Sequence, residues 1–430
     1  MRKLAMQGRV WGSSAAATAA LIVPLLCRGR QARRLVSGRV SWRQRDGVCG
    51  VSASQERTLV EFEEVNGWPQ ILDRSWLLPS AATKTTEVVG REGDWGSVEG
   101  ELPGSCFHVI RDDLLHPIMG GNKLRKLDAL IPLLQARGVT DVVTCGGCQS
   151  AHTAAVAVAC AEMGMKAHLL LRGERPAIPT GYNLVAGMYG YVTYIPRSEY
   201  ADRQTMLQKY AMQLAGDPSC VILLNSKLLT ESSAPGNSKR VAILNEGAGD
   251  CHAILGLIRL VNYLSQPSRF GNQERLRIVV DCGTGTTAIG LAIGIALNGL
   301  PWQVVGVMLA DTQEGYEKQA DRLLSEFSQE YSAHTWEVDL CQKGSSLPIL
   351  WRERFQPRKF GRILPGEVQT CQGIARETGI LLDPIYTLAG WEVANKLCHG
   401  TGAGDGEVVL LHTGGTLGLF GLAQRYPLQF

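Results

Sequence analysis

The chain has 430 residues, a formal net charge of +3 and 45% apolar residues. Its charge is uneven: ten of its 43 lysines and arginines lie in residues 1–45, which contain no acid. The remaining residues, 46–430, contain 33 lysines and arginines and 40 acidic residues, which gives them a net charge of about −7. This balance excludes a basic nucleic-acid-binding surface, and the length predicts two domains or one large α/β unit with a lobe.

Residues 1–45 have the composition of an organelle transit peptide, because they are rich in arginine, contain alanine and serine, and lack acids. The apolar run at 15–27 has 13 residues, too few to span a bilayer. A secretory signal is the main alternative, but Cys27 is followed by arginines rather than by a small-residue cleavage site. We expect a disordered mitochondrial transit peptide, with chloroplast import as the second choice, and no membrane helix in the remainder.

Twelve cysteines are scattered along the chain. They do not form a compact disulfide framework, and a reducing compartment would keep them as thiols. Cys145 and Cys148 are the one close pair, and a zinc site would need a second pair at suitable spacing. We therefore expect no metal site.

From residue 107 onward, short apolar runs alternate with helical segments. Strands are expected at 107–110, 142–144, 167–171, 191–195, 221–224, 241–244, 277–281, 304–309 and 408–411. Helices are expected from residue 123 to about 135 and at 150–163, 182–188, 200–214, 251–264, 286–297, 317–331, 373–378 and 388–397. Loops are expected at 90–104 and 228–239. This alternation predicts parallel sheets with helices on both faces, in which ligands bind beyond the carboxyl ends of the strands.

A lysine stands at the start of the first of these helices, directly after Gly120, Gly121 and Asn122. A lysine that bonds covalently to a carbonyl cofactor needs a tightly set backbone and a site where its amine can lose a proton. Lys123 is the candidate for this role, and Lys126 is expected to be a solvated or supporting charge. The alternative is a plain turn before a charged helix.

The loop that follows residue 281 ends a fully apolar strand and opens a helix of small residues. Gly283 and Gly285 let backbone N–H groups turn inward, threonines add hydroxyl donors, and a helix N-terminus is partly positive, so the loop is typical of a phosphate cradle. It also fits the dinucleotide fingerprint up to Ala288, with Asp311 after the next strand as the ribose ligand. We rank that alternative, and a plain glycine-rich turn, lower.

A second loop between a strand and a helix carries Gln149, Ser150 and His152. The N–H groups of this helix end could hold a carboxylate, with Gln149 and Ser150 as side-chain donors. A role for Ser150 as an N-cap alone is an equally good interpretation. His152, taken alone, is favoured as a helix-surface residue rather than a titrating group.

Five motifs, in order, resemble the 1-aminocyclopropane-1-carboxylate deaminase / D-cysteine desulfhydrase family. They are Gly120-Gly121-Asn122-Lys123-x-Arg125-Lys126-Leu127, Gly146-Gly147-x-Gln149-Ser150, Gly283-Thr284-Gly285-Thr286-Thr287, Asp383-Pro384-x-Tyr386 and His412-Thr413-Gly414-Gly415. The likeness runs from about residue 107 to 420. It implies pyridoxal 5′-phosphate as the cofactor and a two-lobed α/β fold of open parallel or mixed sheets, like the tryptophan-synthase β-subunit. The large cofactor-binding domain would comprise 46–125 and 236–430, and the small domain 126–235.

The resemblance also implies residue roles. Lys123 would bond covalently to the cofactor and act as the base, with Ser150 and Tyr386 as catalytic hydroxyls. The residues that contact the cofactor would be Lys123, Asn122, Gly283, Thr284, Gly285, Thr286, Thr287, Tyr386 and Thr387. Gln149, Ser150 and His152 would face an amino-acid substrate.

Three residues distinguish this chain within the family resemblance. Thr387, expected to face the pyridine nitrogen, matches D-cysteine desulfhydrases, whereas the deaminases have glutamate there. Phe360 stands where the deaminases have a tyrosine. Ala151 stands where an asparagine usually contacts the ring hydroxyl, and the neighbouring His152 is the candidate to compensate. A hydroxyl at the ring nitrogen leaves a weaker electron sink than a carboxylate, which suits β-elimination with a thiolate leaving group.

The sequence therefore predicts a homodimer that converts cysteine, D-cysteine before L-cysteine, to pyruvate, ammonia and hydrogen sulfide. Neither a nucleic acid nor a membrane is an expected partner. The alternatives are 1-aminocyclopropane-1-carboxylate deaminase activity, a dinucleotide-dependent oxidoreductase, and a non-catalytic pyridoxal-phosphate-binding homologue, which Ala151 favours.

Overall fold

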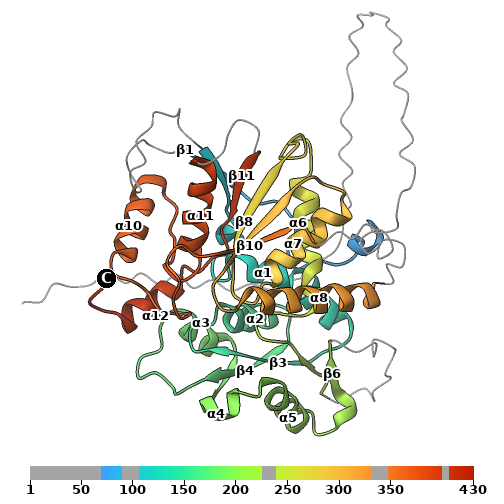
Figure 1. Cartoon of the computed structure of the whole chain (residues 1–430). Coiled ribbons are helices and arrows are strands. Elements are labelled where there is room, and N and C mark those ends of the chain that lie inside the picture. The colour runs from blue at the N-terminus through green and yellow to red at the C-terminus, as the bar shows by residue number, and fades with distance from the viewer. Residues whose placement is uncertain (1–68, 90–105, 225–238, 332–346, 400–405) are drawn as a thin grey trace, which may run out of the picture. The chain divides into compact units, whose positions relative to one another are not determined.

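The computed structural model describes residues 69–89, 106–224, 239–331, 347–399 and 406–430. The expected transit peptide at 1–45 lies outside these residues, and so do nearly all of the expected loops at 90–104 and 228–239. The described residues build two sheets, each with helices packed on it (Figure 1).

Six strands form the larger sheet, in the order β1-β2-β11-β8-β9-β10. Their bounds are β1 Thr85–Val89, β2 Cys106–Ile110, β8 Leu276–Cys282, β9 Gln303–Met308, β10 Ile349–Glu353 and β11 Glu407–Leu411. All neighbouring pairs are parallel except β1 with β2, which is antiparallel. The central strand β8 is buried over nearly its whole length, as a strand covered on both faces should be.

Helices cover both faces of this sheet. Their bounds are α6 Ile254–Leu264, α7 Thr286–Leu297, α8 Gln313–Glu330, α10 Glu367–Thr378 and α11 Thr387–His399. Helices α10 and α11 pack on Val279 and Val305, whereas α6 and α7 pack on Ile278 and Val280. Successive residues of β8 point to opposite faces, so one apolar strand contributes to two core layers.

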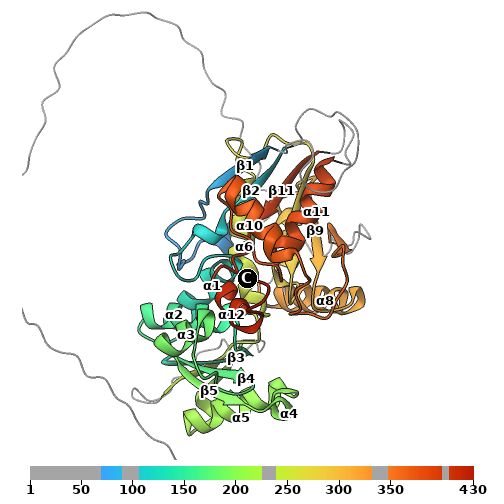
Figure 2. The same ribbon diagram turned by 90° about the vertical axis from the view of Figure 1, so that its left-hand side faces the viewer.

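The smaller sheet has the order β5-β4-β3-β7-β6, and all its neighbouring strands are parallel. The strands are β3 Asp141–Gly147, β4 Lys166–Arg172, β5 Tyr191–Ile195, β6 Val221–Leu223 and β7 Val241–Ile243. The helices around it are α1 Asn122–Ala136, α2 Ala151–Glu162, α3 Gly181–Tyr189, α4 Arg197–Tyr200 and α5 Arg203–Ala215. Helix α12, Gly418–Arg425, lies beside α3 in both views (Figures 1 and 2).

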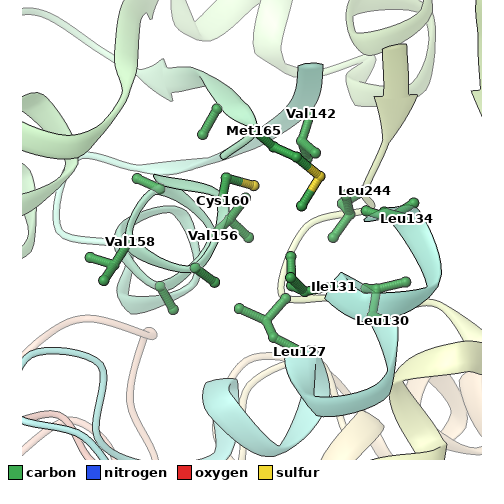
Figure 3. Packing of buried hydrophobic residues seen from close by; sticks show 14 of the residues in the cluster. Leu127, Leu130, Ile131, Leu134, Val142, Val156, Val158, Cys160, Met165 and Leu244 are labelled. Carbon is green, nitrogen blue, oxygen red and sulfur yellow. The ribbon is translucent and has the colours of Figure 1, made fainter. Parts of the chain in front are cut away.

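Helix α1 joins the functional stretch to the core under the smaller sheet. Leu127, Ile131 and Leu134 project from α1 toward Val156 and Cys160 of α2 (Figure 3). These apolar residues recur every three or four positions along α1, which places them on one face of the helix. Lys123 lies one turn before Leu127, at the N-terminal end of the same helix.

The expected α/β class, with helices on both faces of mainly parallel sheets, is confirmed. All the expected strands are present, but the helix expected at 200–214 is divided into α4 and α5. The sequence did not predict β1, β10 or α12. No helix in the described part of the chain has the length and apolarity needed to cross a bilayer. The domain bounds stay a prediction, and β7 of the smaller sheet lies beyond residue 235.

Candidate active site

Two glycines let the loop before α1 approach other backbone segments closely. A Cβ on Gly120 would lie 2.1 Å from the carbonyl oxygen of Asp113, and one on Gly121 would lie 2.0 Å from that of Thr413. Gly121 also has φ of +103°, which L side chains rarely adopt. The Asn122 N–H donates to the same Thr413 oxygen at 3.2 Å. The glycines are therefore needed to seat this loop against residues 412–415.

Lys123 lies in the first turn of α1, and its Nζ donates to Asn122 Oδ1 at 2.9 Å. The Asn122 amide donates in turn to Thr287 Oγ1, also at 2.9 Å. Burial lowers the pKa of the Lys123 amine, and the charge of Asp281 opposes this shift. A lysine with a lowered pKa is more often in the free-amine form that a nucleophile or a base requires.

The predicted phosphate cradle, Gly283–Thr287, joins β8 to the N-terminus of α7. Gly285 is left-handed with φ of +76°, and the hydroxyls of Thr284 and Thr286 lie 3.0 Å apart. A Cβ on Gly283 would lie 3.5 Å from the ring of Tyr386, so this loop and the predicted ring-facing tyrosine are adjacent. Backbone N–H groups at the start of a helix of 12 residues suit a phosphate.

Tyr316 of α8 forms hydrogen bonds with the backbone at the start of this loop. The Tyr316 hydroxyl accepts hydrogen bonds from the N–H groups of Leu309 and Ala310, and it lies 2.7 Å and 3.0 Å from the carbonyl oxygens of Cys282 and Gly283. The Tyr316 side chain thus connects the carboxyl end of β8 to the carboxyl end of β9, next to the predicted phosphate cradle.

Of the two roles expected for Lys126, a solvated or a supporting charge, the solvated one is wrong. Its side chain is buried, and Nζ donates to the carbonyl oxygen of Gly247 at 3.0 Å. Gly247 packs on Thr284 of the cradle. Burial, followed by the nearby charge of Lys123, lowers the pKa of Lys126 well below its ordinary value. A buried lysine amine beside the predicted phosphate cradle fits an anionic ligand, because an anion would favour the protonated form of the amine. The sequence did not show this, because a lysine in a charged first turn normally points to water.

The third site segment is the turn before α11. The Asp383 carboxylate accepts the N–H groups of Ile385, Tyr386 and Thr387 at 2.9, 2.9 and 3.2 Å. The Thr387 hydroxyl accepts the Asp383 N–H at 2.7 Å, and it lies 3.0 Å from Asp383 Oδ2. These bonds fix the backbone at Tyr386 and Thr387. The predicted roles of both side chains toward a cofactor remain proposals.

Phe360 lies against Tyr386, with ring centroids 5.5 Å apart and an interplanar angle of 73°. The side chain of Phe360 is 44% exposed. The residue singled out as a departure from the deaminases therefore borders the predicted ring-facing tyrosine, and it offers no hydroxyl there.

Side-chain hydrogen bonds fix the N-terminal end of α2, the helix that follows β3 of the smaller sheet. Ser150 Oγ accepts the N–H of Thr153 at 3.3 Å, so Ser150 is the N-cap of α2. Gln149 donates from Nε2 to the Thr180 carbonyl at 3.0 Å and accepts the Tyr182 N–H at 3.1 Å. Gln149 thus supports the start of α3. Its contact with substrate, like that of Ser150, stays a prediction.

His152 is buried, so the helix-surface interpretation is wrong. Its Nε2 lies 2.8 Å from Thr144 Oγ1, and that hydroxyl donates to the Leu244 carbonyl. Nε2 must therefore carry the proton, which leaves Nδ1 as an acceptor. Nδ1 has no partner among the described residues. Burial, with the charges of Lys123 and Lys126, lowers the pKa of His152 to about 3, so the ring is neutral at ordinary pH.

Asp281 is a site residue to which the sequence analysis gave no role beyond the last position of the strand expected at 277–281. Its side chain is buried, Oδ1 accepts a hydrogen bond from Thr413 Oγ1 at 2.6 Å, and burial raises its pKa to about 7. One signal was present in the sequence, since an acid at the end of an otherwise apolar, buried strand needs a partner.

These residues fit pyridoxal phosphate. A lysine with a lowered pKa, a cradle of helix-end N–H groups and hydroxyls, a second buried lysine amine and an adjacent tyrosine ring converge at the carboxyl ends of β8 and β11. The buried, unpartnered Nδ1 of His152 additionally offers an acceptor to a ligand hydroxyl. This donor set matches an aldehyde, a phosphate and an aromatic ring in one molecule.

Comparisons with known proteins identify relatives of this chain. A family model described as "Pyridoxal-phosphate dependent enzyme" matches residues 100–414. A protein of Oryza sativa subsp. japonica with the name "Putative D-cysteine desulfhydrase 2, mitochondrial" is 50% identical over 388 residues, which cover 83% of this chain and 93% of that protein. An Arabidopsis thaliana protein named "Bifunctional D-cysteine desulfhydrase/1-aminocyclopropane-1-carboxylate deaminase, mitochondrial" is 26% identical over 331 residues, 74% of each chain.

A solved structure shows the same fold. It is described as an ACC deaminase homologue, has a TM-score of 0.58 and 24% sequence identity, and covers 76% of this chain and 89% of its own. The expected fold of pyridoxal-phosphate enzymes is confirmed, and pyridoxal phosphate is the cofactor.

Proposed function

The chain belongs to the pyridoxal-phosphate-dependent enzymes, within the 1-aminocyclopropane-1-carboxylate deaminase / D-cysteine desulfhydrase family, and we propose that it catalyses β-elimination of cysteine, with D-cysteine favoured. The reaction consumes cysteine and water and yields pyruvate, ammonia and hydrogen sulfide. Relatives named for both D-cysteine desulfhydrase and the deaminase are similar to this chain. The choice between the two reactions therefore has to come from the residues of the site.

Pyridoxal phosphate, when bound, draws electrons from the α-carbon of an amino-acid substrate. Lys123 is the residue proposed to hold it covalently and, once displaced by the substrate amine, to take the α-proton. The lowered pKa of Lys123 supports this role, because only the free amine accepts a proton. The cradle at Gly283–Thr287, the amide of Asn122 and the ammonium of Lys126 are proposed to hold the phosphate end.

Elimination breaks the bond between the β-carbon and sulfur, and the thiolate leaves with the electron pair of that bond. A hydroxyl of Tyr386 or Ser150 is proposed to supply the proton that gives hydrogen sulfide. Burial raises the pKa of Tyr386, which keeps its hydroxyl protonated and able to donate. The remaining three-carbon fragment is hydrolysed to pyruvate and ammonia. The helix end at Gln149 and Ser150 is proposed to bind the α-carboxylate.

The choice of cysteine as the substrate rests on two side chains beside Tyr386, those of Thr387 and Phe360. Thr387 offers a hydroxyl where the deaminases have a carboxylate, and that hydroxyl is engaged with Asp383. Phe360 packs edge-on against Tyr386 without a hydroxyl. A weak electron sink suffices when a thiolate departs, because the leaving group takes up the charge. When the cyclopropane ring of 1-aminocyclopropane-1-carboxylate opens, no group leaves with the charge, so the cofactor has to take it up.

Sulfide release from the purified chain tests the proposal. Residues 46–430, loaded with pyridoxal phosphate, are expected to release sulfide and pyruvate in equal amounts from D-cysteine, and the Lys123→Ala variant is expected to release neither. A visible absorption band that disappears in Lys123→Ala would show that the lysine holds the cofactor. The same band without sulfide from either cysteine enantiomer would instead identify a non-catalytic homologue and reject the proposal.

We further propose a homodimer located in mitochondria. The arginine-rich residues 1–45 and the mitochondrial names of two relatives support the location, and the family resemblance supports the dimer. A fluorescent fusion of the full chain would reveal import into mitochondria or chloroplasts. Sedimentation of residues 46–430 would give the mass of the assembly, and a monomer would overturn the second part.

A further inference from the structure

The segment between β10 and α10, residues 354–366, is neither helix nor strand, and it carries Phe360. The Phe360 ring lies edge-on against Tyr386, with ring centroids 5.5 Å apart, although 44% of the residue is exposed. One ring contact at the surface is too weak to fix a segment that has no ladder of backbone hydrogen bonds. The position of Phe360 therefore depends on the side chains that attach its segment to the turn before α11.

Two buried arginines share one carboxylate at this segment. Arg354 and Arg358 both donate from Nη2 to Glu367 Oε1, the first of them at 3.4 Å. The three side chains are between 6% and 10% exposed. The second oxygen of Glu367 accepts the N–H of Leu364 at 2.8 Å. Removing one member of a buried ionic group leaves the other charges uncompensated, so these side chains keep their arrangement together.

Both guanidinium groups also bind the turn that carries Tyr386. Arg358 donates to the Pro384 carbonyl at 3.4 Å, and Arg354 donates to the same carbonyl at 3.4 Å. Arg354 donates further to the Ile385 carbonyl at 3.5 Å. From its Nε, Arg358 donates to a carbonyl of its own segment, four residues ahead, at 3.0 Å. The planar fork of donors thus lets one arginine join the shared carboxylate, the turn and the segment that carries the phenylalanine.

The other end of the segment is attached by apolar packing and by α12. Ile363 is buried in one apolar cluster with Ile385 of the turn. The hydroxyl of Tyr426, directly after α12, donates to the Gly361 carbonyl at 3.4 Å. Phe360 therefore lies between two anchors, because the arginines precede it and these contacts follow it.

We propose that Arg358 is a positioning residue that holds Phe360 edge-on against Tyr386. Arg354 and Glu367 complete the buried group that keeps its guanidinium in place. The inference rests on the proposed function, in which the two rings border the site and Phe360 directs the reaction toward cysteine. Arg358 touches neither substrate nor cofactor in this role, and it acts only through the ring that its segment carries.

Cleavage by the protease Lys-C measures how firmly the segment is held in the full chain, incubated with pyridoxal phosphate. Lys359 is exposed on the segment and Lys318 is exposed on α8, so the first reports local opening and the second reports global unfolding. In Arg358→Met, cleavage after Lys359 is expected to rise about tenfold or more, and cleavage after Lys318 to change by less than about twofold. Rates are divided by those of the urea-unfolded chain, which removes any effect of the neighbouring residue on the protease.

Arg362→Met is the matched control, because Arg362 is an exposed arginine of the same segment, and its cleavage rates should equal those of wild type. A rise at Lys359 no greater than the rise at Lys318 would overturn the inference, since Arg358 would then support only the general fold. If Arg358→Met does not fold, Arg358→Lys takes its place. That variant keeps the charge but lacks the fork of donors, so a smaller rise at Lys359 alone is expected.

A double-mutant cycle tests whether Arg358 acts through Phe360. The ratio kcat/KM for D-cysteine is measured in wild type, Arg358→Met, Phe360→Ala and the double variant. Arg358→Met is expected to lower the ratio about fivefold or more, mainly through KM and with the visible band retained, but less than about twofold when Phe360 is already alanine. Equal factors in the two backgrounds would contradict the inference. A chain that releases no sulfide would reject the proposed function, whereas the Lys-C rates would still decide whether Arg358 holds the segment.

Discussion

The two sides of the site are assembled in different ways. Around Lys123, loops of the larger sheet approach one another at glycines. Gly121 contacts the Thr413 carbonyl and Gly414 contacts that of Gly120, both backbone to backbone, and Gly415 packs on the Asp383 side chain, at distances that exclude a Cβ. At the helix end of the smaller sheet, Gln149 is joined to its surroundings through side-chain hydrogen bonds. Backbone contacts leave little freedom to the first side, whereas side chains can be exchanged on the second.

The difference suggests a division of labour. The side around Lys123, where the backbone contacts lie, is proposed to hold the groups that any pyridoxal-phosphate reaction needs, namely a lysine, a phosphate cradle and a tyrosine ring. The helix end that carries Gln149 is proposed to face the substrate, and it includes one of this chain's departures from the family resemblance, Ala151 with the buried His152 beside it. We expect substitutions on the first side to abolish cofactor binding, and substitutions on the second to change substrate binding.

The largest effect is expected from Gly121→Ala. The new Cβ would overlap the Thr413 carbonyl, and φ of +103° is strained for alanine, so we expect a loss of about 3 kcal/mol or more in unfolding free energy, together with loss of the visible band. Gly164→Ala is the control, because Gly164 has φ of +74° but open space around it. Its cost should be only about 1 kcal/mol. Urea unfolding and absorbance measure both. Equal costs for the two variants would contradict the close approach.

Lys126→Met is expected to weaken cofactor binding by about tenfold or more, because a charge-assisted contact to the phosphate is lost. Folding without cofactor should change little, since the variant replaces a buried polar side chain by an apolar one of similar length. Titration of cofactor-free protein with pyridoxal phosphate gives the affinity. Lys166→Met, at an exposed position, should bind as wild type does. Unchanged affinity in Lys126→Met would remove this lysine from the phosphate site.

Gln149→Ala tests the second side. It leaves the Thr180 carbonyl and the Tyr182 N–H without their partner, which should loosen the start of α3. We expect KM for D-cysteine to rise by roughly tenfold, with the visible band retained. Steady-state kinetics and an absorption spectrum suffice. Loss of the band would show that the two sides are not separable in the way described.

A further prediction concerns the loss of stability at acid pH that the buried His152 should cause. Its pKa is about 3 in the fold and near 6.5 when unfolded, so the unfolded chain binds a proton more readily as pH falls below about 6.5. The low pKa of His152 in the fold should therefore lower the free energy of unfolding by about 2 kcal/mol at pH 5 relative to pH 8. In His152→Gln that part of the loss should vanish. Urea unfolding at the two pH values compares the variants, and identical pH dependence would mean that His152 titrates normally.

Much of the fold could be predicted because strands and helices alternate with clear apolar periodicity from residue 107 onward. The missed strands β1 and β10 lie at the two edges of the larger sheet. Their sequences, TTEVV and ILWRE, mix polar and apolar residues. The missed helix α12 has only eight residues. For such short or edge elements, pairing with a neighbour decides the structure more than the local pattern does.

The site was predictable where a motif fixes the backbone and was not where burial decides. Gly121, Lys123 and Gly285 follow from local sequence, because turns and helix starts need those residue types. The burial of Lys126, His152 and Asp281 depends on segments far away in the sequence, such as Gly247 and Thr413. Periodicity cannot report such contacts. Only the end of the apolar strand at Asp281 offered a local signal.

Phe360 and Thr387 are proposed to direct the shared chemistry toward cysteine. The most direct test is one reaction vessel that contains the cofactor-loaded chain with equal amounts of D-cysteine, L-cysteine and 1-aminocyclopropane-1-carboxylate, with products identified by mass spectrometry. Isotope labels on the two cysteines distinguish their pyruvate. Pyruvate and sulfide, chiefly from D-cysteine, with no 2-oxobutanoate, is the predicted result. The four-carbon keto acid as the main product would contradict the account.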